Sequence, residues 1–124
     1  MAAEAPQTPE QWFAEGLRCF RKPDGVRAVA AFEQVLELDP GFRTAEGDTA
    51  YFYLGKISEV EGRLDAALEY YTQALILIPG DEESLIGRGA CLTVLRRHHE
   101  AVADFRRVLG IPPALRRVAA GPIL

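Results

Sequence analysis

Apolar residues recur at helical spacing in six stretches of the chain, each about a dozen residues long. Short breaks rich in Gly, Pro or charged residues separate these stretches and fall at 23–25, 39–41, 61–63, 79–81 and 96–98. The pattern predicts six main helices, arranged as three helix-turn-helix units. The first helix is expected to begin at Pro9, because Thr8 is a suitable N-cap and Gln11 can complete a capping box.

The three units carry matching side chains at matching positions. Each has a large residue, a Gly four positions later, an Ala, an aromatic residue four positions after that Ala, and a closing Pro. The residues are Trp12, Gly16, Ala28, Phe32 and Pro40, then Tyr51, Gly55, Ala67, Tyr71 and Pro79, then Leu85, Gly89, Ala101, Phe105 and Pro113. Small residues let antiparallel helices approach closely, and bulky ones interlock around them. We therefore expect small and large residues to interlock within each unit.

This pattern resembles the tetratricopeptide repeat, a motif of about 34 residues with a Leu-Gly pair, a small Ala, aromatic residues and a closing Pro. The resemblance covers residues 9–113, although Glu15 and Arg88 replace the motif's Leu in the first and third units. It implies an all-α fold, namely a right-handed solenoid of three helical hairpins with six helices. A short C-terminal helix is expected to follow at 114–120.

The resemblance also divides the chain into segments. The expected segments are an N-terminal tail at 1–8, one domain at 9–120 with repeats at 9–42, 48–81 and 82–115, and a C-terminal tail at 121–124. The interval from Pro40 to Tyr51 is longer than the equivalent interval from Pro79 to Leu85, so the sequence indicates an insertion within 41–48. The insertion either extends the following helix backward or forms a loop.

In folds of this kind the first helix of each pair lines a concave groove that can hold a peptide. The first helices offer a set of groove candidates, namely Phe13, Leu17, Phe20, Phe52, Tyr53, Lys56, Glu59, Ile86 and Ala90. For the first unit, packing in the core is an equally good interpretation of the apolar candidates. The resemblance implies a scaffold, an adaptor or a chaperone-like module that binds another protein.

Many chaperone-binding members of the family hold a C-terminal carboxylate with Lys, Asn and Arg side chains on the first helices. The matching positions here are Phe13, Leu17, Tyr53, Glu83 and Gly87, so this carboxylate clamp is not expected. The groove should instead suit an apolar or helical segment, with Lys56 as its central cation. Basic flanks on that segment would match Glu10, Glu59 and Glu83 at the edges.

Charge is distributed unevenly along the chain. Residues 1–83 carry sixteen acidic and seven basic side chains, whereas residues 84–124 carry two acidic and seven basic ones. The second set includes three arginine pairs that form a candidate electrostatic surface, namely Arg96, Arg97, Arg106, Arg107, Arg116 and Arg117. Solvated faces and helix ends are the simplest interpretation of these pairs. An acidic protein partner, or head-to-tail self-association with the acidic end of another copy, is the alternative, and nucleic acid ranks last because aromatic residues are not interleaved.

Nothing in the sequence indicates catalysis, a cofactor or a metal. Cys19 and Cys91 are far apart and are expected to be small core residues, and the His98-His99 pair lacks further ligands at metal-site spacing. No apolar run is long enough to span a membrane, and the start does not resemble a secretory signal, so a cytoplasmic location is expected. A small secretion-type chaperone with three repeats is a further alternative, based on size and repeat number alone.

Overall fold

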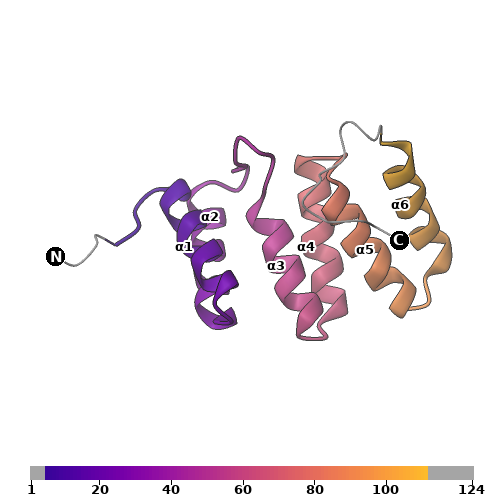
Figure 1. The fold of residues 1–124 in the computed structure, drawn as a ribbon, viewed down its shortest axis with the longest axis horizontal. Coiled ribbons are helices and arrows are strands. Elements are labelled where there is room, and N and C mark those ends of the chain that lie inside the picture. Colours follow the sequence, from indigo (N-terminus) through magenta and orange to yellow (C-terminus); the bar gives the residue numbers. More distant parts are fainter. Residues whose placement is uncertain (1–4, 112–124) are drawn as a thin grey trace.

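The computed structural model describes residues 5–111, which form six α-helices and, within that range, no strand. The helices are α1 (Pro9–Arg21), α2 (Gly25–Leu38), α3 (Ala50–Val60), α4 (Leu64–Leu77), α5 (Glu82–Val94) and α6 (His98–Gly110). Successive pairs form hairpins that stack side by side along one axis (Figure 1). The predicted all-α fold of helical hairpins is confirmed. The C-terminal helix predicted at 114–120 lies outside the described residues.

The helix starts follow from local capping residues. The Thr8 hydroxyl accepts a hydrogen bond from the backbone N–H of Gln11 at 3.1 Å, and the Gln11 side chain accepts one from the backbone N–H of Thr8 at 3.1 Å. This capping box satisfies backbone donors at the start of α1, which begins at Pro9 as predicted. Thr49 caps α3 in a similar way, because its hydroxyl accepts from the backbone N–H of Phe52 at 3.1 Å.

Inside each hairpin, a glycine of the first helix packs against an aromatic ring of the second. A Cβ atom added at Gly16 would lie 2.7 Å from the ring of Phe32. The same contact recurs in the next hairpins, where a Cβ at Gly55 or Gly89 would lie 2.8 Å from the rings of Tyr71 and Phe105. The predicted interlocking of small and large residues is therefore present in all three hairpins.

The contact between hairpins differs along the stack. The ring of Tyr53 in α3 stacks on Phe32 of α2, with centroids 5.1 Å apart and planes inclined by 6°. At the equivalent place in α5, Gly87 has no side chain, and the Tyr71 ring lies directly against the helix backbone. The first two hairpins therefore stand further apart than the second and third (Figure 1).

The insertion forms a loop and does not extend α3. Its turn is closed by the backbone N–H of Thr44, which donates to the carbonyl of Asp48 at 2.9 Å, and Gly47 takes a positive φ of 84°. Phe42 at the start of the loop is buried, and its ring lies 5.5 Å from that of Phe13 in α1. The loop thus covers part of the first hairpin.

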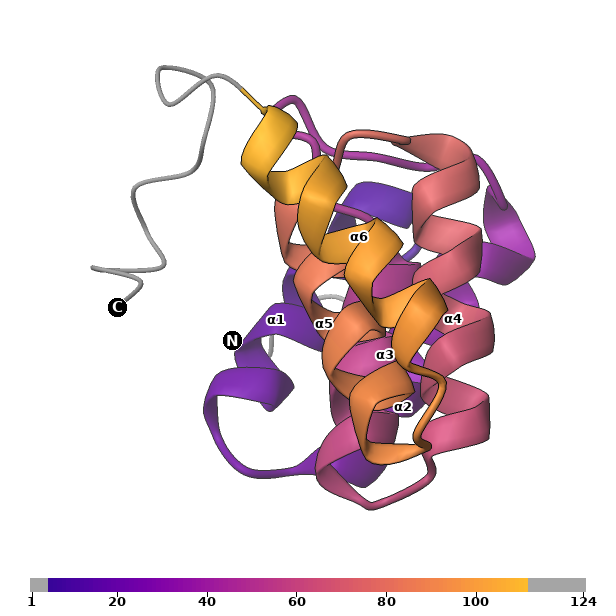
Figure 2. The same cartoon turned by 90° about the vertical axis from the view of Figure 1, so that its right-hand side faces the viewer.

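The two kinds of helix occupy different sides of the stack. Seen along its long axis, α1 and α5 lie on one side and α4 on the other, with α6 at the near end (Figure 2). The first helices α1, α3 and α5 therefore share a side, and α3 also contacts α5 directly. Of the helices formed by residues 5–111, none is both long and apolar enough to pass through a bilayer.

Candidate peptide-binding face

A ridge of aromatic side chains joins the first helices of hairpins one and two. The rings of Phe20 in α1 and Tyr53 in α3 have centroids 5.2 Å apart, and Phe52 lies 5.0 Å from Tyr53. Both contacts are edge-on, a favourable geometry for aromatic pairs. All three side chains are half-buried, so each combines a fixed position with some exposed surface. We name Phe20, Tyr53 and Phe52 the aromatic ridge.

Phe13 differs from the other groove candidates because it belongs to the core. Its side chain is only 4% exposed. The rings of Phe32, Phe42 and Tyr53 surround it, with centroids 5.5, 5.5 and 5.8 Å away. Its assignment to the groove is therefore corrected. Phe42 comes from the insertion, whose packing could not be read from the repeat pattern.

The polar candidates on α3 have different environments. Lys56 is exposed, whereas Glu59 is half-buried and accepts a hydrogen bond from the Tyr71 hydroxyl at 2.6 Å. Burial raises the pKa of Tyr71 far above its ordinary value, and the hydrogen bond to Glu59 adds to this effect. Tyr71 therefore remains a donor that holds the Glu59 carboxylate in place, while Lys56 is free to meet solvent or a ligand.

The third hairpin contributes smaller side chains to the same side. Ile86 and Ala90, one helical turn apart on α5, are both half-buried. Ile86 packs against a buried cluster formed by Leu75, Leu85 and Val108. Leu17 on α1 is also half-buried. Apart from Phe13, every predicted groove residue thus retains exposed surface.

A cleft of about 530 Å³ lies between α1 and the insertion loop. Its apolar lining includes Ala14, Leu17 and Phe42, and acidic side chains at its edges are Glu10, Glu46 and Asp48. The repeat pattern gave no indication of this cleft, because it depends on how the insertion folds back. The departure from repeat spacing within 41–48 was the only available signal.

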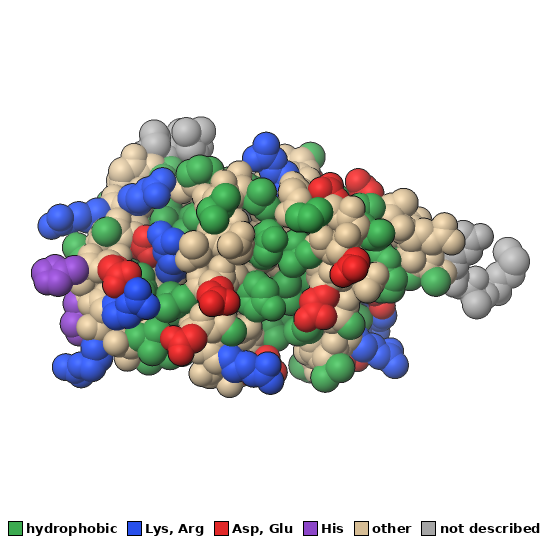
Figure 3. Space-filling view, turned by 180° about the vertical axis from the view of Figure 1, so that it is seen from behind, with side chains coloured by type: hydrophobic (Ala, Val, Ile, Leu, Met, Phe, Trp, Pro, Cys, Tyr) green, Lys and Arg blue, Asp and Glu red, His purple; other side chains and the backbone are tan. Residues whose placement is uncertain are grey.

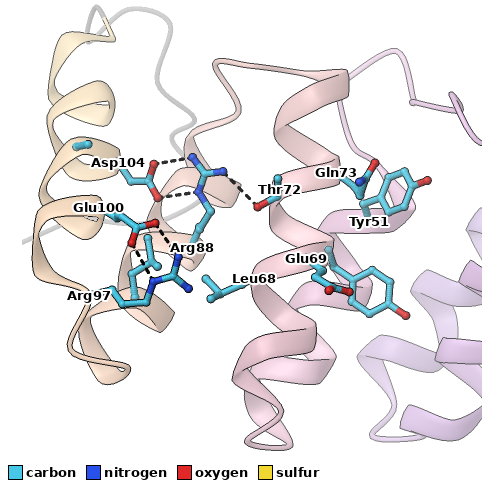
Figure 4. A pocket seen from close by; sticks show the side chains of 12 residues that line it. Tyr51, Leu68, Glu69, Thr72, Gln73, Arg88, Arg97, Glu100 and Asp104 are labelled. Atoms are coloured by element: carbon cyan, nitrogen blue, oxygen red, sulfur yellow. Dashed lines mark hydrogen bonds and ion pairs between the residues drawn. The ribbon is translucent and has the colours of Figure 1, made fainter.

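A second cleft, of about 650 Å³, lies on the side of the second helices (Figure 4). Arg88 of α5 crosses its wall and donates to both carboxylate oxygens of Asp104 in α6, at 2.8 and 2.7 Å. It also donates to the Thr72 hydroxyl at 3.3 Å. The hydrogen bonds to Asp104 raise the pKa of Arg88. Figure 3 shows the side of the molecule that carries this cleft, turned by 180° from the view of Figure 1. Hydrophobic side chains lie along the middle of this side.

The described arginines of the predicted electrostatic surface do not behave alike. Arg97 pairs with Glu100 at 2.8 Å, and Arg107 donates to the carbonyl of Pro79 at 3.0 Å. Arg96 and Arg106 are exposed and make no ion pair within residues 5–111. Arg96 also occupies the turn between α5 and α6 with a positive φ of 63°. Arg116 and Arg117 lie outside the described residues.

The two cysteines are buried thiols in different hairpins. Burial raises the pKa of Cys91 to about 11 and also raises that of Cys19. Both thiols are therefore protonated at neutral pH and poor nucleophiles. Within the described range, no group of three or more His, Cys, Asp or Glu residues could hold a metal ion.

Comparison with known proteins agrees with the architecture described above. Residues 24–82 match the family model of the tetratricopeptide repeat. The second repeat domain of Spaghetti (RPAP3), solved with the HSP90 peptide SRMEEVD, has a TM-score of 0.76 and 20% identity, covering 86% of this chain and 94% of that one. The crystal structure of MamA has a TM-score of 0.75 and 23% identity to this chain. The superposition covers 83% of this chain and 57% of the MamA chain. Residues 24–82 thus carry the tetratricopeptide repeat, and the three hairpins have the fold of that repeat.

One curated relative is much longer than this chain. The cell division cycle protein 27 homolog of Caenorhabditis elegans is 26% identical over 117 residues, which cover 94% of this chain. The same alignment covers only 14% of that relative. The chain thus matches a small part of a much longer protein.

Proposed function

We propose that this protein is an interaction module that binds a peptide or helical segment of another protein on the side formed by α1, α3 and α5. The observation that carries the proposal is the aromatic ridge. Half-exposed aromatic side chains held at fixed positions are typical of binding surfaces, because they bury much area at low entropic cost. Leu17, Ile86 and Ala90 extend apolar surface to either side of the ridge.

The charges around this side suggest the chemistry of the ligand. Lys56 is the exposed cation of α3, and acidic residues stand at the edges, including Glu10 beside the cleft at α1. An apolar or helical segment with basic flanks would match this arrangement. The Spaghetti domain was solved with an acidic peptide, but Glu83 and Gly87 stand here where the carboxylate clamp has cations. We therefore propose a ligand of a different kind.

The test is affinity capture from native lysate followed by mass spectrometry. Wild type is compared with a Leu17→Glu, Phe20→Glu double variant, whose side chains are half-exposed in α1. The matched control is Val26→Glu with Ile76→Glu, which places the same charge on exposed apolar positions of α2 and α4. Circular dichroism confirms that each variant retains its helices.

We expect the captured protein to be lost with the α1 variant and retained with the control. A dissociation constant for that protein, measured by isothermal titration calorimetry, should rise by at least about tenfold, equivalent to about 1.4 kcal/mol. Equal capture by wild type and the α1 variant would rule out the first-helix side. If the captured protein is lost only with the control variant, the binding site lies on the side of the second helices.

A further inference from the structure

Helix α6 ends the described stack with an apolar outer side. Val102, Phe105 and Leu109 lie three and four residues apart and therefore share one face of the helix. They are 45%, 36% and 72% exposed, respectively. We name these three residues the α6 stripe. In the end-on view, α6 lies at the near end of the molecule (Figure 2).

The same positions are covered in the two earlier hairpins. Phe32 and Tyr71, the counterparts of Phe105, are both fully buried. The first helix of the next hairpin covers each of them, through Tyr53 on Phe32 and through the backbone at Gly87 on Tyr71. Phe105 packs on Gly89 of its own hairpin but remains partly exposed on its other side. The α6 stripe therefore has the composition of a surface that receives a helix.

The opposite end of the stack is polar. In α3 and α5, one face of the helix covers the preceding hairpin. The equivalent face of α1 has no hairpin before it among the described residues, and it carries four exposed residues, namely Gln11, Ala14, Arg18 and Arg21. Of its two arginines, Arg18 pairs with Glu15 in the same helix. The stack thus begins with a solvated face and ends with an apolar one.

The surroundings of the α6 stripe are basic. Residues 84–111 contain five arginines and two carboxylates, and both carboxylates are already paired, Asp104 with Arg88 and Glu100 with Arg97. Arg106, which follows Phe105 in α6, and Arg96, in the turn before α6, are both exposed. Basic side chains gather at the end of the molecule that carries the histidines (Figure 3). An acidic occupant would therefore be favoured over a neutral or basic one.

This charge disfavours three occupants that the 124 residues could supply. The α1 face of a second copy presents Arg18 and Arg21, and the α6 stripe of a second copy has the same basic surroundings. Residues 112–124 contain Arg116 and Arg117 but no acidic residue. Like charges would oppose all three contacts.

We propose that the α6 stripe is a second binding surface, which receives an amphipathic helix of another protein with acidic residues beside its apolar face. The helix would lie along α6 as α3 lies on α2 and as α5 lies on α4. The stripe lies at the end of the stack, whereas the aromatic ridge lies on its first-helix side. The protein would then hold two different partners at once.

The test uses the 124-residue chain and two labelled synthetic helices of about 18 residues, long enough to form a helix. Both helices carry leucines at positions i, i+3 and i+7; one has glutamates beside the leucines and the other has lysines. Fluorescence anisotropy gives their dissociation constants. We expect the glutamate helix to bind at least about tenfold more tightly than the lysine helix.

Variants of exposed residues locate the site. Val102→Ser with Leu109→Ser should weaken binding of the glutamate helix at least about tenfold, and Arg106→Glu should weaken it several-fold. The matched control, Val26→Ser with Val60→Ser, also removes two exposed apolar side chains and should bind like wild type. The Leu17→Glu, Phe20→Glu variant should also bind normally, which separates this proposal from that of the first-helix side.

Three results would overturn the proposal. Equal or absent binding of the two synthetic helices would remove the case for an acidic partner. Sedimentation equilibrium could show a dimer that Val102→Ser with Leu109→Ser dissociates, which would assign the stripe to a second copy. Binding that appears only after deletion of residues 113–124 would assign it to the chain's own C-terminal segment.

Discussion

At the scale of single residues, one glycine sets how closely two hairpins approach. Tyr53 and Gly87 occupy equivalent positions in α3 and α5. The Tyr53 ring separates α3 from α2 by the thickness of an aromatic stack, whereas Gly87 allows the Tyr71 ring to touch the α5 backbone. Side-chain size at one repeated position therefore contributes to the spacing of the stack.

Gly87→Ala should destabilise the protein. The new Cβ would lie 2.5 Å from the Tyr71 ring, which is buried and held by its hydrogen bond to Glu59. Overpacking of this kind costs about 1–3 kcal/mol, and the gain of about 1 kcal/mol from the helix propensity of Ala offsets only part of it. The midpoint of urea unfolding should fall.

Gly110→Ala is the matched control for this prediction. Gly110 also lies in a helix, but a Cβ added there would meet no other atom of residues 5–111 within 4 Å. This variant should be as stable as wild type or slightly more stable. Equal midpoints for Gly87→Ala and Gly110→Ala would show that the contact with Tyr71 relaxes without cost.

At the scale of elements, the third hairpin is joined differently from the second. Leu54 is buried in α3, but its counterpart in α5 is Arg88, which reaches across to Asp104 in α6. The side chains of Arg88 and Asp104 are 23% and 5% exposed. A two-point ion pair with good geometry thus replaces apolar packing between the helices of this hairpin.

Asp104→Ala should lower the free energy of unfolding by about 2–3 kcal/mol, because it leaves the partly buried Arg88 without its carboxylate. The double variant Arg88→Leu, Asp104→Ala should recover to within about 1 kcal/mol of wild type, since apolar residues often replace buried ion pairs without loss. Urea unfolding of wild type, both single variants and the double variant forms a complete cycle.

The same cycle tests whether Arg88 and Asp104 stabilise the third hairpin as a pair. Additive losses in the double variant would mean that Arg88 and Asp104 stabilise the hairpin independently. The Arg88→Leu variant alone should lose at least as much as Asp104→Ala, because it leaves the Asp104 carboxylate, only 5% exposed, without a partner, whereas Arg88, 23% exposed, can still reach solvent.

At the scale of the whole molecule, the hairpins depend on one another. Phe32 of hairpin one is covered by Tyr53 of hairpin two, and Tyr71 of hairpin two is covered by the backbone of hairpin three. Loss of either end would therefore expose an aromatic ring of its neighbour. Cooperative unfolding of the described hairpins follows from this arrangement.

The two thiols provide a test of that cooperativity. Cys19 is buried in hairpin one and Cys91 in hairpin three, and burial holds the pKa of Cys91 at about 11. Alkylation by iodoacetamide at pH 8 should thus be slow in the native protein and become fast over one range of urea concentration for both thiols. Mass spectrometry of the digested chain measures each site, and clearly separate midpoints would show that the ends unfold independently.

The sequence by itself determined the repeated, local features of this protein. Helical periodicity, breaks and caps predicted six helices and the start at Pro9, and matched small and large residues predicted that such residues interlock within each hairpin, as Gly16 and Phe32 do. These features depend on residues close in sequence or on a pattern that recurs in phase. The groove residues other than Phe13 remain predictions, because the sequence and the fold identify surface without identifying its ligand.

Only the tertiary structure decided the features that depend on single long-range contacts. Phe42 belongs to an insertion outside the repeat, so the pattern could not show that it closes over Phe13 and makes that residue part of the core. The pairing of Arg88 with Asp104 was also hidden, since each residue departs from the repeat separately. Exposure of Phe105 likewise depends on which helix covers it in space. Spacing along the chain determines helices, whereas neighbours across the fold determine which of their side chains remain available for binding.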